Sequence, residues 1–387
     1  MNKTLICLIP KTRHLESADQ FRSISLCNVT LKIATKLIAD RLRGALDSII
    51  SPAQSAFIHR RLISDNILIV HEVFHYIKKR KKDWTKLFAL KLDMRKAYNR
   101  LDWRFVEAIL SRLGFHHRWV QLVMECIRSV SYSLLINGST KVTINPSCGI
   151  RQADPLSSAL FILCSQVLSS VITAAEANGS IQGIRVRNRG PKMTHLLFAD
   201  DCLLFGQANL QEVTTLKDCL ELYCKASGQE VKSSLTFSPN THSSFKRWFS
   251  KIIKIPYDDG PSKHLGLPTE FGTSKAILFN DLKDKTLKRM QGWKQNLLSH
   301  AGKEVLLKSI AFYMSNFASS HFKLLSSFHS QIRKVTTNFY WGDSTNKNKI
   351  YWVSGSRLCR SKQKGGLSFK DPKLENQALL SKLAWRL

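Results

Sequence analysis

The chain has 387 residues, 43% of them hydrophobic, which is enough to bury a core and to form two or three subdomains. This composition excludes a disordered or fibrous protein. Lys and Arg total 59 against 28 Asp and Glu, for a formal net charge of +31 at pH 7. Such a charge indicates a polyanionic partner. Residues 241–387 carry 26 basic and 9 acidic side chains, so the excess is not confined to a short tail.

Other features of the composition narrow the class further. We find no apolar stretch approaching the roughly 18 to 20 residues that span a bilayer, so we expect nucleic acid and not a membrane as the partner. The nine cysteines include no pair at the spacing of a zinc ribbon or redox motif, and the N-terminal apolar run is too short for a signal peptide. We therefore expect an intracellular protein with reduced thiols.

The first hundred residues predict two helices and a strand. Apolar residues spaced by three and four predict an amphipathic helix over residues 28–50 with a basic outer face. A second helix is expected to begin at Ser64 or Asp65 and to run into the basic residues 78–82. The segment LFALKLDM (87–94) predicts a short apolar strand.

The middle of the chain predicts hairpins separated by helices. A helix from Trp103 is expected to end before Gly114, and SYSLLING with KVTIN predicts a hairpin. The loop PSCGIRQADPLS then opens a long helix that is rich in small residues. THLLFADDCLLFG predicts a strand, a two-residue tip formed by Asp200 and Asp201, and a second strand. A helix over about 210–226 follows and ends at Gly228.

The pattern changes beyond Lys263, where long basic amphipathic helices are predicted over about 274–298 and 302–340. A C-terminal piece carrying Trp341, Trp352 and Trp385 follows. We therefore expect a domain boundary near residues 262–275.

Three carboxylates stand where apolar strands end. Asp200 and Asp201 lie between HLLF and CLLF, and Asp93 follows the strand LFALKL. Burying such charges is costly without a counter-charge, and Asp-Asp is a poor choice for a two-residue turn, so chemistry explains the pair better than turn propensity. Three carboxylates on adjacent strand ends can hold two Mg²⁺ ions, with Mn²⁺ as the alternative metal, for in-line phosphoryl transfer. The alternative without any metal site is that Asp200 and Asp201 form a solvated turn.

Three blocks of sequence carry a resemblance to a known family. KLDMRKAYNRLDW (91–103), GIRQADPLSSALFIL (149–163) and HLLFADDCLLFG (195–206) resemble, in this order, blocks of non-LTR (LINE-like) reverse transcriptases, with plant elements the most similar. The resemblance covers nearly the whole chain. It implies an α+β right-hand polymerase fold, in which the palm is an antiparallel sheet packed on helices and the thumb is mainly helical. The implied domains are fingers (1–86), palm (87–268), thumb (269–345) and a truncated C-terminal segment (346–387).

The resemblance also implies an activity and its partners. An RNA-directed DNA polymerase would copy an RNA template by extending a DNA primer with deoxynucleoside triphosphates, with Asp93, Asp200 and Asp201 as the catalytic metal ligands. The family's usual endonuclease does not match any part of the chain, so we expect another protein to supply a priming nick. The biology of the family implies that the protein is located in the nucleus.

Further positions match residues with roles in the family. Arg22 matches an arginine that contacts the incoming triphosphate, and Tyr98 an aromatic residue that faces its sugar. Gln152 matches a nucleotide-binding residue. Five more positions match template or primer contacts, and the last three of them resemble the primer-gripping turn. They are Arg151, Ala153, His264, Leu265 and Gly266.

The chain departs from the family pattern at several positions. Ala153 and Arg60 stand where glycine is expected. At Ala153 the added methyl group matters if the backbone approaches the template closely there or needs glycine's dihedral angles. Ser23 and Ser158 stand for prolines, and Asn99 for an aspartate. None of these substitutions removes a metal ligand. Together they suggest a copy of the element that has accumulated substitutions and has weak or absent activity.

Two other functions compete with polymerisation. A domesticated or degenerate copy would bind nucleic acid without turnover. The segment HEVFH (His71 to His75) matches the H-E-x-x-H pattern of zinc hydrolases on a predicted helix, but no convincing third ligand follows it. Bound zinc at His71 and His75 would discriminate in favour of the hydrolase.

Overall fold

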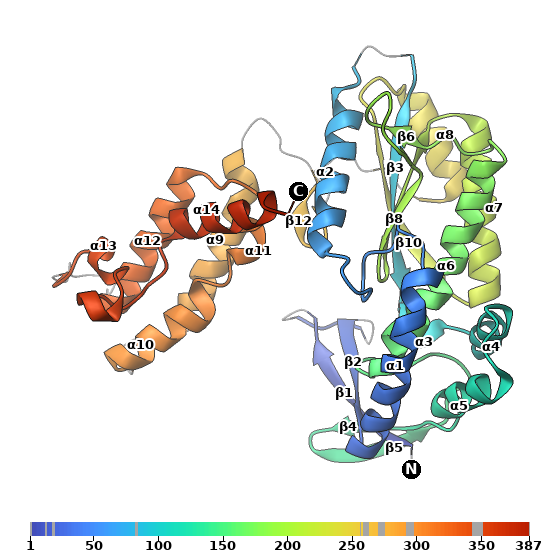
Figure 1. The fold of residues 1–387 in the computed structure, drawn as a ribbon, viewed down its shortest axis with the longest axis horizontal. Helices are drawn as coiled ribbons and strands as arrows, with labels where there is room; N and C mark the ends of the chain where they lie inside the picture. The colour runs from blue at the N-terminus through green and yellow to red at the C-terminus, as the bar shows by residue number, and fades with distance from the viewer. Residues whose placement is uncertain are drawn as a thin grey trace. The chain divides into compact units, whose positions relative to one another are not determined.

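A computed structural model describes residues 2–11, 14–17, 20–81, 84–255, 257, 263–269, 275–291, 298–342 and 351–386. The chain divides into two compact units, residues 1–260 and residues 261–387 (Figure 1). The division falls immediately before the boundary predicted at 262–275.

The centre of the first unit is a four-stranded antiparallel sheet. Its order is β10-β3-β9-β8. The strands are β3 (Leu87–Arg95), β8 (His195–Phe198), β9 (Asp201–Gln207) and β10 (Glu230–Phe237). Figure 1 shows helix α2 on one face and α6, α7 and α8 on the other. Because side chains alternate along a strand, Phe88 and Leu90 of β3 pack in the core shared with α6 and α7, while Leu87 and Ala89 pack with α2.

The helices of this unit follow the apolar periodicity of the sequence. Asn28 accepts a hydrogen bond from the Leu31 N–H and caps α1, and Asp154 does the same for α6 through the Leu156 N–H. Gly228 ends α7 in a left-handed conformation, as predicted. The helices are α1 (Val29–Ile49), α2 (Ile63–Lys79), α3 (Ala97–Arg100), α4 (Trp103–Arg112), α5 (His117–Arg128), α6 (Pro155–Ala177), α7 (Leu210–Ser227) and α8 (Ser243–Ile253).

Helix α6 corrects one expectation from the sequence. With 23 residues, it is long and apolar enough by length and composition to cross a membrane, although we expected no such stretch. Its buried residues, among them Leu160, Ile162 and Leu168, belong to the main core of the first unit. A core helix of a folded domain has the same apolar character, because it is covered by protein on most sides.

A second sheet holds the N-terminal strands. Its order is β2-β1-β4-β5, in which β1 and β4 run parallel and the other pairs antiparallel. The strands are β1 (Lys3–Pro10), β2 (Phe21–Cys27), β4 (Ser131–Ile136) and β5 (Ser139–Ile144). The hairpin predicted from SYSLLING and KVTIN is β4–β5. A small hairpin of β6 (Ile184–Arg185) and β7 (Lys192–Met193) lies beside α2.

The second unit is mainly helical. It begins with a hairpin of β11 (Lys263–His264) and β12 (Leu267–Pro268). Its helical elements are α9 (Lys275–Gln291), α10 (His300–Leu306), the π-helical turn η3 (Leu307–Ala311), α11 (Asn316–Ser319), α12 (Ser326–Trp341), α13 (Gly355–Leu358), the 3₁₀ turn η4 (Lys362–Lys364) and α14 (Pro372–Ala384). The end of the helix predicted over 274–298 lies outside the described residues.

The prediction of one continuous helix over 302–340 is wrong. The chain breaks between α11 and α12, where Asn376 of α14 satisfies the freed backbone. Its side chain accepts a hydrogen bond from the Leu324 N–H at 3.0 Å and donates to the carbonyls of Ser319 and Phe322 at 2.6 and 2.8 Å. Apolar periodicity does not reveal the break, because the partner that stabilises it lies more than 50 residues away.

Candidate active site

The three predicted carboxylates lie at one end of the central sheet. Asp93 of β3 and Asp201 of β9 are direct partners in the antiparallel register. Phe198 also pairs with Asp201, so Ala199 and Asp200 form the two-residue turn, and Ala199 takes φ 54°. The predicted tip of Asp200 and Asp201 was therefore wrong by one residue, because the backbone of Asp201 is held in the ladder.

Charge and burial act in opposite directions on these carboxyl groups. Burial raises the pKa of Asp200, and the negative charge of Asp93 raises it further, while Arg22 lowers it. Burial also raises the pKa of Asp201, and Lys91, whose Nζ lies 3.7 Å from Asp201 Oδ1, lowers it. Negative charges close together at one end of the sheet disfavour one another's ionisation, so the site favours the binding of a cation.

The donor set fits a hard divalent ion by its chemistry. Carboxylate oxygens are the ligands that Mg²⁺ prefers, and the register brings two of the three carboxylates to facing positions. Within the described ranges, no three His, Cys, Asp or Glu side chains are arranged as a ready-made metal centre. The same finding leaves His71 and His75 of HEVFH without a third ligand among these residues.

An open cleft of about 970 Å³ extends from Asp200. It brings together four residues that were predicted from different parts of the chain: Arg22, Tyr98, Gln152 and Ala153. Phe57, Asp154, Pro155 and Ser158 complete its lining. Asp93 and Asp201 are not among the residues that line it.

Tyr98 lies in the short helix α3, close after β3. Its ring stacks on Phe161 of α6, with centroids 4.9 Å apart and planes 13° apart. Burial, helped by the charge of Asp200, raises the pKa of Tyr98 to about 12, so its hydroxyl is protonated at neutral pH. The packing fixes the ring at the wall of the cleft, where it restricts the shape of whatever enters.

Both positions where glycine was expected have a left-handed backbone. Ala153 takes φ 71° and Arg60 takes φ 61°. Side chains other than glycine are strained at these angles. The concern that glycine's dihedral angles are needed at Ala153 is therefore confirmed. Ser23 and Asn99, two other departures from the pattern, contact one another, because Asn99 Nδ2 donates to Ser23 Oγ at 3.4 Å.

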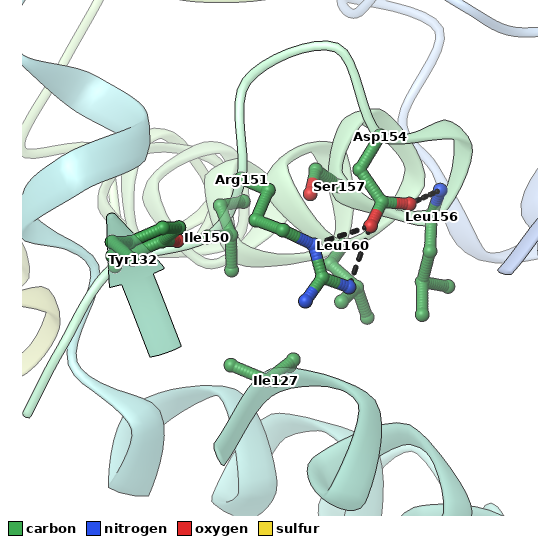
Figure 2. Close-up of a pocket in the computed structure, with 9 residues that line it drawn as sticks. Ile127, Tyr132, Ile150, Arg151, Asp154, Leu156, Ser157 and Leu160 are labelled. Atoms are coloured by element: carbon green, nitrogen blue, oxygen red, sulfur yellow. Dashed lines mark hydrogen bonds and ion pairs between the residues drawn. The ribbon is translucent and has the colours of Figure 1, made fainter. Parts of the chain in front are cut away.

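Arg151 does not face the cleft. Its guanidinium is buried and bonded to Asp154, with Nε and Nη2 at 2.7 and 2.6 Å from Oδ2. Figure 2 shows this pair beside Tyr132 and Ile127, with a second Asp154 oxygen bonded to the start of α6. Nη1 also donates to Asn2 Oδ1 at 2.8 Å. These hydrogen bonds hold the loop 149–154 from inside, and the contact of Arg151 with template or primer stays a prediction.

The turn at His264, Leu265 and Gly266 belongs to the second unit. Leu265 and Gly266 form a two-residue hairpin loop with φ 51° and 81°, both positive, as hairpin turns of the I′ class require. His264 is buried. All three residues lie in the compact unit that begins at residue 261.

Sequence reasoning missed a glutamine that positions the carboxylate turn. Gln54 is buried, and its Oε1 accepts hydrogen bonds from the Ala199 N–H at 3.2 Å and the Ala56 N–H at 2.9 Å. The backbone on both sides of it pairs with Leu197. No local pattern marks Gln54, whereas Asp154, also missed, carries the helix-start signal of Asp before Pro and an apolar run.

Comparison with known proteins identifies the family. The model of the family "Reverse transcriptase (RNA-dependent DNA polymerase)" matches residues 9–236, which include all three carboxylates. The chain belongs to the reverse transcriptase family. Its α+β architecture is accordingly a right-hand polymerase fold, and members of the family use divalent metal ions.

Relatives of this reverse transcriptase domain come from mobile elements. It is 24% identical over 380 residues to the transposon TX1 149 kDa protein of Xenopus laevis, covering 94% of this chain and 27% of that protein. It is 26% identical over 210 residues to the Pol polyprotein of the type-1 retrotransposable element R2 of Popillia japonica, covering 54% and 28%. These matches identify the domain as that of a non-LTR retrotransposon. The chain spans about a quarter of the length of both relatives.

Two further similarities are more limited. An uncharacterized mitochondrial protein of Arabidopsis thaliana is 52% identical over 67 residues, which are 17% of this chain and 55% of that protein. A solved telomerase structure from Candida tropicalis aligns with a TM-score of 0.45 and 13% identity, covering 88% of this chain and 63% of that chain.

Proposed function

We propose that this chain is the polymerase part of a plant-type non-LTR retrotransposon, and that it extends a DNA primer on an RNA template with deoxynucleoside triphosphates. The observation that carries the proposal is the pairing of Asp93 with Asp201 beside a turn that directs Asp200 into a cleft. The short Arabidopsis match supports the plant origin. We further propose that the chain acts in the nucleus.

The carboxylates would hold two Mg²⁺ ions in this proposal. When bound, such ions activate the primer 3′ hydroxyl and neutralise the leaving pyrophosphate. The protein itself would orient the nucleotide. Arg22, exposed on β2 at the cleft, would bind its triphosphate, and the fixed ring of Tyr98 would face the sugar. Gln152, which also lines the cleft, would lie near the nascent base pair.

The rest of the chain would hold the primer–template duplex. We propose that residues 1–86 form the fingers, 87–268 the palm, 269–345 the thumb and 346–387 a C-terminal segment. The turn at His264 to Gly266 would grip the primer strand. The basic helices that follow would contact duplex phosphates, which position the nucleic acid without reading its sequence.

A second candidate function rests on the strained backbone. Ala153 and Arg60 are both at positive φ, where the family has glycine, and Ala153 lines the cleft. Each costs about 1 to 2 kcal/mol of strain, which favours a loop that departs from the productive shape. A degenerate copy would then bind nucleic acid without catalysing DNA synthesis.

Primer extension separates these two functions. We would measure incorporation of deoxynucleotides on a primed RNA template with Mg²⁺, and compare the chain with its Asp200→Ala, Asp201→Ala double variant. The control is Asp218→Ala, which removes an exposed carboxylate of α7. The proposal expects synthesis by the chain and the control, and a loss of at least about a thousandfold in the double variant.

The other outcomes are equally informative. If the chain makes no product but binds an RNA–DNA duplex in a salt-sensitive manner, the degenerate binder is favoured. Restoring Ala153→Gly and Arg60→Gly then tests whether the strained positions silenced it. Equal synthesis by the double variant and the chain would contradict the role of the carboxylates.

A further inference from the structure

A second hollow lies at the opposite end of the central sheet from the carboxylates. Its empty volume is about 650 Å³, and its lining includes Leu87 of β3 and Gln207 of β9. These two residues pair with each other six positions along the ladder from the pair Asp93 and Asp201. At ~3.3 Å per residue, roughly 20 Å of strand separates the two sites. A ligand in this hollow is therefore not in the polymerase cleft.

The lining of this hollow is cationic. Arg80, Arg185 and Lys192 contribute to it, together with Tyr76, Gln182 and other uncharged residues, and none of the described residues that line it is acidic. Glu212 lies next to this region, because its Oε2 accepts a hydrogen bond from the Gln207 N–H, but only 1% of it is exposed. The hollow thus offers positive charge and hydrogen-bonding groups to a ligand.

Two chain segments concentrate further charge around it. The β6–β7 hairpin, residues 184–193, carries Arg185, Arg187, Arg189 and Lys192, all exposed, and no acid. The end of α2 adds residues 78–81, which are all Lys or Arg. Cations at a helix C-terminus are favoured by the helix dipole, which accounts for the α2 residues without a ligand. The hairpin has no such explanation, and four like charges within ten residues repel one another.

The base of the hollow is rigid. Ile184, Val186 and Met193 of the hairpin pack on the apolar core between α2 and the sheet. The Arg80 guanidinium lies over the Tyr76 ring, 4.5 Å from its centroid, so a planar surface is already in place at the rim. A rigid site loses little conformational entropy when a ligand binds.

We propose that this hollow, with the β6–β7 hairpin, is a second nucleic-acid site that holds a single-stranded segment of RNA. The arginines would contact successive phosphates, and a base would stack on the plane formed by Tyr76 and Arg80. Stacking requires an unpaired base, which a duplex does not present, so the geometry favours a single strand. Binding at this site would depend on the charge and packing of residues in the first unit, and not on catalysis by the carboxylates.

The test is a binding measurement on the full chain without nucleotides or metal. The polymerase cleft is first saturated with unlabelled RNA–DNA duplex, and labelled single-stranded RNA is then titrated by fluorescence anisotropy. The site variant is Arg185→Gln, Arg187→Gln, Arg189→Gln. The control removes three exposed cations of unit 1 that lie on other helices, as Arg112→Gln, Arg118→Gln, Lys225→Gln.

The proposal expects a clear difference between the two triple variants. The site variant should bind single-stranded RNA at least about tenfold more weakly, and the slope of log K against log salt should fall by about 2. The control should change affinity less than about twofold. Duplex binding should be the same in both variants, which also shows that the site variant is folded.

Three results would overturn the proposal. The first is an equal loss in the site variant and the control, and the second is the absence of single-strand binding once the duplex saturates the cleft. The third is equally tight displacement by double-stranded RNA, which would mean that the hollow recognises charge alone. A Tyr76→Leu variant sharpens the last point, because it should weaken single-strand binding severalfold and leave its salt slope unchanged.

Discussion

Two segments reach the candidate cleft, and they are held in place by different forces. The carboxylate hairpin, residues 195–207, is fixed by main-chain pairing with β3 and by the uncharged side chain of Gln54. The loop 149–154 is fixed by the buried ion pair of Arg151 and Asp154. The carboxylates are therefore positioned by the sheet itself. The loop beside them combines main-chain hydrogen bonds to Leu101 and Tyr98 with a buried pair of charges that also bonds to Asn2.

The same contrast extends to how each segment is anchored to α6. At the start of β8, His195 Nε2 lies 2.7 Å from Ser169 Oγ and Nδ1 lies 3.0 Å from Thr194 Oγ1. Thr194 Oγ1 in turn donates to Glu176 Oε2. The hairpin thus relies on a neutral histidine, and the loop on a charged arginine. Removing charge should disturb the loop, and adding charge should disturb the hairpin.

The largest effect is expected from breaking the ion pair. Arg151→Met leaves Asp154 buried and unpaired, which costs about 3 to 5 kcal/mol in the free energy of unfolding. Urea denaturation measures it. The control is Arg128→Met, which breaks the half-exposed pair with Glu107 and should cost about 0.5 kcal/mol. Similar losses in the two variants would mean that the loop is not held by this pair.

The next effect is a pH dependence from the carboxylate hairpin. Burial lowers the pKa of His195 from 6.5 to about 4, so the folded state resists protonation. Above pH 6.5 the histidine is neutral in both states and there is no penalty. As the pH falls from 6.5 to 4, the unfolded state binds the proton first, and stability falls by about 3 kcal/mol in total.

A variant separates the contribution of His195 to the pH dependence of stability from the contributions of the other titratable groups. His195→Asn should lose less stability than the parent chain between pH 6.5 and 4, as measured by urea denaturation at each pH. His75→Gln, at an exposed position of α2, should leave the difference unchanged. An unchanged pH dependence in His195→Asn would show that the histidine is not held neutral.

A smaller effect is expected at Gln54. Gln54→Leu keeps the size of the side chain but leaves the Ala199 and Ala56 N–H groups without their acceptor, at a cost of about 2 kcal/mol. Hydrogen exchange at the Ala199 amide should accelerate. Gln121→Leu, at an exposed position of α5, serves as the control and should leave that amide protected. If main-chain pairing alone fixes the turn, both variants will behave alike.

The smallest effect has the opposite sign. Ala153→Gly should stabilise the chain by about 0.5 to 1 kcal/mol, because relief of strain at φ 71° exceeds the entropy that glycine adds to the unfolded state. Thermal unfolding measures the gain. Ala34→Gly, in the exposed part of α1, should instead destabilise the chain by about 1 kcal/mol. A loss in both variants would show that Ala153 is not strained.

The sequence by itself determined the elements that carry the chemistry. Two continuous apolar runs on either side of adjacent acids in HLLFADDCLLFG predicted a hairpin with carboxylates at its end, because a strand buried on both faces is apolar at successive positions. The order of three motifs predicted the family. Comparison with the family pattern also marked Ala153 and Arg60 as positions where glycine is expected, and both have a positive φ.

Only the tertiary structure decided the features that depend on distant partners. The register that places Asp93 beside Asp201 joins two strands that are distant in sequence, and the buried Arg151 bonds to Asn2, 149 residues away. The break before α12 depends on Asn376 in the same way. Periodicity and propensity describe a segment and its immediate neighbours, whereas these features are stabilised by hydrogen bonds between residues that only folding brings together.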